Sequence, residues 1–420
     1  MTGASIRLDL IIPPGAPGMF RRLAVRPGRA IPLTREWHNP EALASPPGRP
    51  IARFEGRQRT ARAGACRLTL IEGTLRAGRR REVVWRLTVE GPGDAVLALD
   101  LPDAAVAGES LDGAAMRLAG RAAAEAPPAL PVLDPAMTAS DALALALAHF
   151  GDRLRRLAPI ADAGAGPEGV HQMRVTVRRT RSALKLFRRA AGDGALDPIA
   201  GALRALGQAL APARDWDVFL GGTARAVAAT AGPEAARRLV AIARRRRAGA
   251  YADLHGYLCG PEFARLGVLM AVCALSQPWT YTAPAEDLAT PLAQFADSAL
   301  RRQWKRLAAP GGDLADLPEA RLHDIRLEAK RLRYAAELFA GLHDRKRAAR
   351  FIDRLTSLQE QLGHLNDGVV ADTLLDALGP AGRSYAGGVA RGLVAARGEG
   401  LRSAIERTWR RLRGTKRFWS

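Results

Sequence analysis

Residues 170–187 read VHQMRVTVRRTRSALKLF, and residues 322–339 read LHDIRLEAKRLRYAAELF. Both stretches follow the spacing His-x-x-Arg-x-x-x-(Arg/Lys)-Arg-x-Arg, and both end in Leu-Phe. Each residue of the first stretch lies 152 positions before its counterpart in the second, and the same offset relates Asp215 to Asp367. A match of this length without an insertion indicates an internal duplication.

The spacing of the motif predicts an amphipathic helix in each copy. At 3.6 residues per turn, the basic positions fall within about a quarter of the helix circumference. Apolar residues such as Met173 and Phe187 fall on another face, which we expect to be buried. The two basic stripes differ at their far ends, because Glu337 stands where the first copy has Lys185. A repeated stripe of like charges favours a polyanion-binding surface, and the alternative is a solvated or internally salt-bridged face.

The paired motif, with Arg214-Asp215 and Asn366-Asp367 downstream in the same register, resembles the CHAD domain family. The resemblance covers about residues 138–420. It implies an all-α domain of two pseudo-symmetric four-helix bundles that binds inorganic polyphosphate without catalysis. The predicted polyphosphate-binding residues are His171, Arg174, Arg178, Arg179, Arg181 and Lys185 in the first copy and His323, Arg326, Lys330, Arg331 and Arg333 in the second.

The composition of the whole chain is that of a strongly basic globular protein. Its 420 residues carry a formal net charge of +21, and the sequence pI is about 11.2. We therefore expect a polyanionic partner, which is polyphosphate, nucleic acid or an anionic membrane surface. The histidines form no recognisable metal spacing, and no dinucleotide or nucleotide fingerprint is present, so we expect neither a metal nor another cofactor.

Several features of the sequence predict the compartment. The three cysteines are widely spaced, which argues against a disulfide framework or a zinc site and for a reducing environment. The chain starts without an apolar signal sequence, and its longest apolar run, residues 266–276, is far shorter than the ~20 residues of a membrane span. These features predict a soluble cytoplasmic protein without a membrane span, and the resemblance extends this expectation to polyphosphate granules.

Residues 1–125 predict a small antiparallel β-rich domain. Ile6, Leu8 and Leu10 alternate with charged residues, and residues 82–90 alternate again, which is the period of a half-buried strand. Pro- and Gly-rich turns separate such runs, and residues 93–101 predict a short helix. Residues 126–137 are rich in Ala and Pro, which predicts a semi-rigid linker to the helical domain at 138–420.

The arrangement of residues 1–125 weakly resembles the CYTH triphosphatase domain, in which an N-terminal Glu-x-Glu-x-Lys strand holds a metal and contacts phosphate. Here the corresponding strand reads Arg7-Leu8-Asp9-Leu10-Ile11, with one carboxylate and no lysine. Metal-assisted phosphoryl hydrolysis needs hard oxygen ligands, so we expect a degenerate, inactive relative. The alternative is an unrelated β-rich docking domain.

The helical domain is expected to contain four helices in each half, packed as two bundles. A polar residue at 138 or 140 is expected to cap the first helix. Helix breaks are expected after Leu210 and, in the second half, after Leu362. Asp215 and Asp367 would then either cap the following helix or pair with a motif arginine.

Three functions fit these observations. The leading one is a non-enzymatic polyphosphate-binding protein, in which the two motif histidines either donate to phosphate or are packed residues. The second is a metal-dependent triphosphate or polyphosphate hydrolase that depends on Glu72, Glu82 and Glu90. The third is a nucleic-acid-binding protein, although few aromatic residues that can stack on bases lie among the basic ones. The basic run at 244–247 either extends the anion surface or is solvated.

Overall fold

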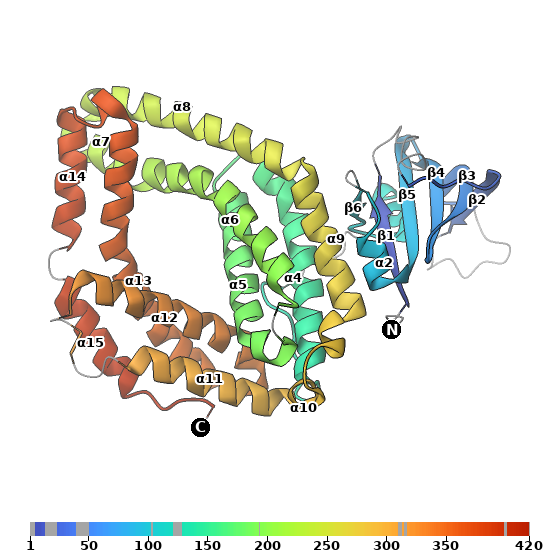
Figure 1. Ribbon diagram of the computed structural model, residues 1–420. Coiled ribbons are helices and arrows are strands. Elements are labelled where there is room, and N and C mark those ends of the chain that lie inside the picture. Colours follow the sequence, from blue (N-terminus) through green and yellow to red (C-terminus); the bar gives the residue numbers. More distant parts are fainter. Residues whose placement is uncertain are drawn as a thin grey trace.

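The computed structural model contains two parts, an antiparallel β-sheet and a larger helical part that follows it (Figure 1). The residues that the structure describes are 5–12, 23–38, 50–101, 104–120, 128–192, 194–309, 313–314, 317–398 and 401–419. Residues 121–127, which include the first two residues of the predicted linker, and the side chains of residues 364–369, which include Asp367, lie outside this description. The predicted α+β class, with a small antiparallel sheet before an all-α part, is confirmed.

The elements have the following bounds. The strands are β1 (Ser5–Ile11), β2 (Ile31–Trp37), β3 (Ala52–Ala63), β4 (Cys66–Ala77), β5 (Arg80–Pro92) and β6 (Ala105–Val106). The helices beside the sheet are α2 (Gly93–Leu97) and α3 (Leu111–Leu118). The helices of the first half are α4 (Ala139–Asp162), α5 (Glu168–Ala191), α6 (Asp197–Val218), the π-helix η1 (Phe219–Ala224), α7 (Arg225–Ala231), α8 (Pro233–Leu258) and α9 (Pro261–Ser276). The connection holds η2 (Pro278–Tyr281) and α10 (Ala285–Ala289), and the second half holds α11 (Leu292–Ala308), α12 (Glu319–Phe339), η3 (Ala340–Leu342), α13 (Arg345–Ala377), η4 (Gly379–Ala381), α14 (Tyr385–Gly398) and α15 (Leu401–Arg413).

The strands form one sheet in the order β2-β3-β4-β5-β1-β6, and all neighbouring strands run antiparallel. The predicted alternation in β1 is confirmed, because Ile6, Leu8 and Leu10 are buried whereas Arg7 and Asp9 are exposed. Successive side chains of a strand point to opposite faces, and this alternation gives the sheet an apolar face against which helices pack.

Helices cover both faces of the sheet. On one face, strand residues such as Leu70 pack with Val96 of α2 and Val272 of α9. On the other face, α3 covers a second cluster that contains Leu75, five residues further along β4. The short predicted helix is confirmed as α2, although it ends four residues earlier than expected. A Cβ at Gly93 would lie 2.6 Å from Cβ of Ser276, so only glycine lets α2 begin this close to α9.

The predicted duplication is visible in the helical part. The helices α4 and α11 begin 153 positions apart, α5 and α12 begin 151 apart, and α8 and α14 begin 152 apart. The first four-helix bundle consists of α4, α5, α6 and α9, and the second consists of α11, α12, α13 and α15. The long helix α8 leaves the first bundle and reaches α14, which also packs against α7 (Figure 1). The two halves therefore meet at the α5–α12 crossing and at the α7–α8–α14 corner, with further contacts between α4 and α11 and between α6 and α13.

The helix α4 begins directly after Thr138, one of the two residues predicted to cap it. The side-chain oxygen of Thr138 accepts from the backbone N–H of Asp141 at 3.2 Å, and the Asp141 carboxylate accepts from the backbone N–H of Thr138 at 3.2 Å. This reciprocal pair is a capping box, which satisfies backbone donors at the helix start.

The two predicted helix breaks are wrong. The helix α6 continues through Pro212 to Val218, and α13 runs unbroken from Arg345 to Ala377. In α6 the residues around the expected break are core residues: Leu210 and Ala213 are fully buried and Trp216 nearly so. Their burial stabilises the helix against the unfavourable proline, because packing overrides local propensity. Asp215 therefore lies inside a helix and caps none.

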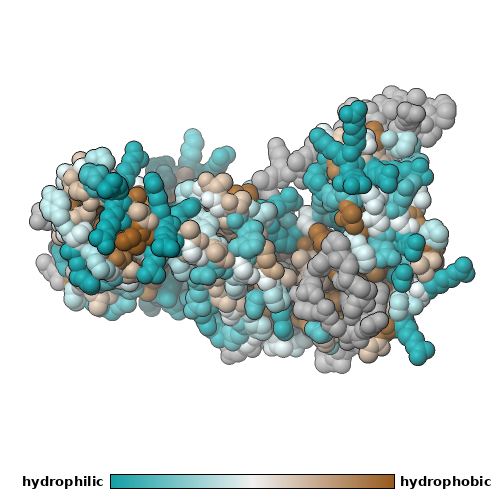
Figure 2. Space-filling model, turned by 90° about the horizontal axis from the view of Figure 1, so that it is seen from above, coloured by the Kyte–Doolittle hydropathy of each residue, from teal (hydrophilic) through white to brown (hydrophobic). Residues whose placement is uncertain are grey.

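Figure 2 shows how hydrophilic and hydrophobic residues are distributed over one face of the molecule. In the view from above, hydrophilic residues cover most of the described surface, and hydrophobic residues show only in small areas between them (Figure 2). Within the described ranges, no single helix is long and apolar enough to cross a membrane, whereas α8 and α9, bent by 51° at their junction, meet the length and composition criteria only as a pair.

Candidate polyanion-binding groove

The two motif helices, α5 and α12, cross near their C-terminal ends. The ring of Phe187 meets the ring of its repeat counterpart Phe339 edge-on, with centroids 6.2 Å apart, and stacks on Phe295 of α11 at 4.8 Å. Both motif phenylalanines are fully buried. Because equivalent residues touch, the crossing lies near the pseudo-two-fold axis, and it brings the basic face of each helix close to that of the other.

A groove lies between α5, α12 and α13. It has a volume of about 260 Å³ and is lined by Arg178 of α5, by Arg326, Lys330 and Tyr334 of α12, and by Gln359, Glu360 and Gly363 of α13. We call this the central groove. Nε of Arg178 is buried and has no hydrogen-bond partner in the part of the chain that the structure describes. A buried donor of this kind is expected to find an acceptor, which a bound anion can supply.

The N-terminal half of α5 continues this basic face. Burial lowers the pKa of Arg174, and the neighbouring Asp215 of α6 acts in the opposite direction. Burial raises the pKa of the Asp215 carboxyl, while Arg174 and Arg214 lower it. Asp215 was predicted either to cap a helix or to pair with a motif arginine, and the structure favours the second role, with Arg174 as the partner.

The motif histidines lie in different environments. His171 is half-buried, and burial followed by the charges of Arg214, Arg178 and Arg174 lowers its pKa, against the effect of Glu168. His323, its counterpart in α12, is exposed. The repeated histidine therefore differs in burial between the two copies.

Two arginines of the motif are held by a carboxylate of the motif itself. The Arg179 Nη2 of α5 donates to Glu337 Oε2 at 2.9 Å, and Arg333 Nη1 lies 3.0 Å from Glu337 Oε1. Nε of Arg333 also donates to Gln359 Oε1 at 2.7 Å. The three charged side chains are only 11–19% exposed. This ion-paired cluster ties α5 to α12, so Arg179 and Arg333 serve the crossing rather than an open stripe.

Two further predicted residues, Lys185 and Arg331, line a second pocket. It has a volume of about 290 Å³ and is lined by Lys185 and Arg188 of α5, Arg306 of α11 and Arg331 of α12, with Ser182, Leu186 and Gln303. We call this the lateral pocket. Arg331 pairs with Glu328, and Arg188 lies 3.6 Å from Asp197. Partial burial and then the charges of Arg331 and Arg181 lower the pKa of Lys185.

The lateral pocket and the ion-paired cluster are related by the duplication. The offset of 152 carries Arg179 onto Arg331 and Lys185 onto Glu337. On one side of the crossing, Arg179 pairs with Glu337. On the other side, the equivalent Arg331 lies near Lys185. A single residue difference, Glu337 in place of Lys185, therefore puts a carboxylate between two arginines on one side and leaves a lysine beside Arg331 on the other.

Several basic residues outside the repeated motif lie beside the motif residues in the structure. Arg214 of α6 faces His171 and Arg174, and Arg306 of α11 lines the lateral pocket. The pair Lys305-Arg306 echoes Arg155-Arg156 of α4, which is a sequence signal for Arg306. The run at 244–247 is partly engaged: Arg247 Nε donates to Asp217 Oδ1 at 2.7 Å, and Arg246 donates to the carbonyl of Ala377 at 3.3 Å.

The carboxylates that a hydrolase would need are separated and paired with arginine. Glu72 lies 3.5 Å from Arg59, and Glu90 lies 3.6 Å from Arg7. Arg117 donates to Glu82 at 2.8 Å. Over the described ranges, no group of three potential metal ligands includes any of these glutamates. Among the described residues of the sheet, these glutamates are therefore held in ion pairs with arginine rather than grouped as metal ligands.

The comparisons with known proteins agree with this architecture. A scan against family models matches the CHAD domain at residues 141–376, more than half of the chain. The CHAD domain from the plant Ricinus communis is 30% identical with a TM-score of 0.55, and the match covers 70% of this chain and 98% of that one. PptA from Streptomyces chartreusis is 20% identical with a TM-score of 0.48, and the match covers 65% and 99%. A search of curated proteins found no match.

The family match does not reach the sheet, because it begins at residue 141 in α4. The CYTH-like interpretation of residues 1–125 thus gains no support from it and stays a prediction. For the helical part, the repeated motif, the paired bundles, the family match and the similarity to the plant domain coincide. The chain belongs to the CHAD domain family.

Proposed function

We propose that this protein binds inorganic polyphosphate, without catalysis, in the central groove and along the lateral pocket. The observation that supports this most is the meeting of basic side chains from two crossing helices, where the buried Nε of Arg178 has no hydrogen-bond partner among the described residues. Lys330 lines the groove and the next residue, Arg331, lines the pocket, so a flexible chain of phosphates can contact both sides of α12.

Polyphosphate suits this surface because it is a linear anion with regularly spaced charge and no base or side chain to recognise. Affinity for such a ligand comes from many charge-assisted hydrogen bonds and falls as salt replaces the released counterions. Arginine presents several donors in a fixed fork and stays charged at physiological pH. The groove and pocket together present Arg178, Arg326, Lys330, Arg331 and Lys185 for these contacts.

The site is tested by measuring polyphosphate binding at two salt concentrations, for the wild type and for Arg178→Ala/Lys330→Ala. We expect about a hundredfold lower affinity in the variant, because it loses two charge-assisted contacts, each worth about 1.5 kcal/mol or more. The slope of log affinity against log salt should also fall by about one for each lost contact.

The matched control for this measurement is Arg76→Ala/Arg237→Ala, which removes the same charge from exposed positions in β4 and α8. It should change affinity by less than threefold, because distant exposed charges are screened within about 10 Å. Equal losses in both variants would show that net charge, not the groove, determines binding. Absence of binding by the wild type would contradict the proposal itself.

A nucleic acid is the main competitor as a ligand. Phe187 and Phe339 are fully buried and cannot stack on bases, and Tyr334, the aromatic residue that lines the central groove, is 5% exposed. Affinity for single strands usually depends on such stacking. Competition between polyphosphate and single-stranded DNA of matched charge should therefore favour polyphosphate, and preferential binding of DNA would support the competing function.

Hydrolysis is the second alternative, and the paired glutamates Glu72, Glu82 and Glu90 speak against it. Release of phosphate from tripolyphosphate with Mg²⁺ or Mn²⁺, lost when these three glutamates become glutamine, would overturn the non-catalytic proposal. We also propose a cytoplasmic location at polyphosphate granules, which fluorescence microscopy of the tagged protein tests directly.

We expect polyphosphate affinity to rise as the pH falls from 8 towards 6, and His171→Gln to reduce this rise. In the free protein, burial and three arginines hold the pKa of His171 below its ordinary value, so the ring is neutral at pH 7. Bound phosphate adds negative charge and raises this pKa, so binding takes up a proton between the two pKa values.

The affinity gain therefore appears as pH falls through the bound-state pKa and is complete below the free-state pKa. It amounts to about tenfold for each unit by which the ligand shifts the pKa. His323→Gln is the control, because it removes the exposed counterpart in α12. Protonation of polyphosphate itself affects the measurement equally for the wild type, His171→Gln and His323→Gln, so it does not contribute to the difference between them. Identical pH profiles for wild type and His171→Gln would rule out this role of His171.

A further inference from the structure

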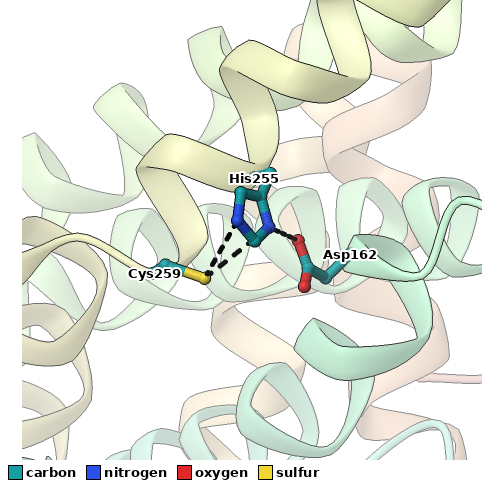
Figure 3. A group of neighbouring side chains, drawn as sticks. All are labelled: Asp162, His255 and Cys259. Atoms are coloured by element: carbon teal, nitrogen blue, oxygen red, sulfur yellow. Dashed lines mark hydrogen bonds and ion pairs between the residues drawn. The ribbon is translucent and has the colours of Figure 1, made fainter.

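A cluster of three potential metal ligands lies at the junction of two helix ends, away from the groove. His255 in the last turn of α8 and Cys259 just beyond it are four residues apart, and Asp162 is the last residue of α4. His255 Nδ1 lies 2.7 Å from Asp162 Oδ1, and Cys259 Sγ lies 3.7 Å from Nδ1 and 4.0 Å from Nε2 of the same ring (Figure 3). All three residues offer ligand atoms within 4.8 Å of one another.

From this geometry we infer that Asp162, His255 and Cys259 form a Zn²⁺ site. Zinc binds thiolate sulfur at about 2.3 Å and imidazole nitrogen or carboxylate oxygen at about 2.0 Å, so tetrahedral ligand atoms lie about 3.3–3.5 Å apart. The separation of Cys259 Sγ from Nδ1, 3.7 Å, is close to this value, and that of Asp162 Oδ1 from Nδ1 is about half an ångström shorter than this value. Because Sγ is nearly equidistant from both ring nitrogens, metal binding also requires the exposed side chains of His255 and Cys259 to rotate.

The ligand types select the metal. A thiolate and an imidazole suit zinc, whereas Mg²⁺ and Ca²⁺ prefer an all-oxygen shell. Three protein ligands leave one tetrahedral position open for water or an exogenous ligand. Cys259 also lines the 450 Å³ pocket between the sheet and the helices, which includes Val106 of β6 and Phe263 of α9. A metal bound by Cys259 would therefore border the contact between the two parts of the protein.

The backbone electrostatics of the site also favour a cation. Both α4 and α8 end here, and a helix C-terminus carries about half a negative charge. Arg155 and Arg156 are opposing charges that line the same pocket as Cys259. Both are paired with Asp152, at 2.9 Å and 2.8 Å, so this group contributes about one net positive charge rather than two.

Sequence patterns miss this cluster for a definite reason. Counting cysteines and histidines predicted no zinc site, yet the spacing of His255 and Cys259 places both on one face of a helix. The third ligand lies 93 residues earlier, on another helix. Only the packing of α4 against α8 brings it into range.

Titration of the intact, untagged protein with Co²⁺, a spectroscopic substitute for Zn²⁺, tests this site without polyphosphate. We expect one equivalent to bind with strong visible bands of four-coordinate cobalt and a thiolate-to-cobalt charge-transfer band in the near ultraviolet. Zn²⁺ should displace it. Cys259→Ser should abolish the charge-transfer band, and Asp162→Asn should weaken binding at least tenfold.

The matched control is Cys273→Ser, which removes a thiol that is 4% exposed and whose pKa burial raises to about 11. This variant should keep the full cobalt spectrum. Far-ultraviolet circular dichroism shows whether each variant is folded, and a folded Cys259→Ser protein with an unchanged charge-transfer band would overturn the assignment. Absence of that band in the wild type at millimolar Co²⁺ would overturn it as well.

Discussion

Glu337→Lys is expected to lower the free energy of unfolding by at least about 3 kcal/mol. The carboxylate of Glu337 is 11% exposed and holds Arg179 of α5 and Arg333 of α12 at 2.9 Å and 3.0 Å. Removing one member of a buried ion pair leaves an uncompensated charge and typically costs 3–5 kcal/mol. We treat the lower end of this range as the minimum: Arg333 keeps its hydrogen bond to Gln359, but the new ammonium group also repels Arg179 and Arg333. Urea denaturation followed by circular dichroism measures the change.

The matched control is Lys185→Glu, at the position that the duplication relates to Glu337. A glutamate at position 185 would face the positively charged Arg331, and the substitution would break no existing buried ion pair. Stability should stay within about 1 kcal/mol of the wild type, because an exposed pair contributes little. Polyphosphate affinity should instead fall about tenfold, since the lateral pocket loses a charge-assisted contact. Equal destabilisation by both variants would contradict the asymmetry of the crossing.

The duplication and its helices could be predicted because they depend on local spacing. The register between the two motifs places the helix starts of the second half within one residue for α11, α12 and α14. The expected breaks were wrong because residues such as Pro212 favour a stop locally, while the buried Leu210 and Ala213 make continuation more favourable. In α6, the burial of these side chains outweighs the local preference of proline for a helix stop.

The candidate site was predictable only in part, because a stripe on one helix does not say what faces it. The crossing of α5 and α12 separates the basic residues into the central groove, the ion-paired cluster and the lateral pocket. Arg179 and Glu337 are 158 residues apart, and their pairing follows from the crossing alone. Arg214 and Arg306 join the basic surface from neighbouring helices. Such contacts depend on tertiary packing, which the spacing of one motif does not contain.

Asp217→Ala is expected to cost about 3–5 kcal/mol of unfolding free energy. The side chain of Asp217 in α6 is 2% exposed, and it accepts from Arg247 Nε at 2.7 Å and from the hydroxyl of Tyr251 at 2.8 Å, both in α8. Burial and this hydrogen bond raise the pKa of Tyr251 to about 12, so the phenol stays a donor at neutral pH. The network fastens α6 to the long helix that reaches the second half (Figure 1).

A double-variant cycle separates the lost ion pair from a general packing defect. In Asp217→Ala/Arg247→Met the unpaired guanidinium is absent, and methionine keeps an apolar stem over the ring of Tyr251, where Arg247 now lies 4.2 Å from the centroid. The double variant should therefore be more stable than Asp217→Ala, because replacing both members of a buried pair costs less than removing one. Residues in direct contact give coupling energies of about 0.5–3 kcal/mol, which denaturation can resolve. Additive losses would mean that Asp217 acts through packing and that the charge of Arg247 is solvated. Coupled losses would instead show why this arginine belongs to the scaffold of α8 and not to the polyanion-binding surface.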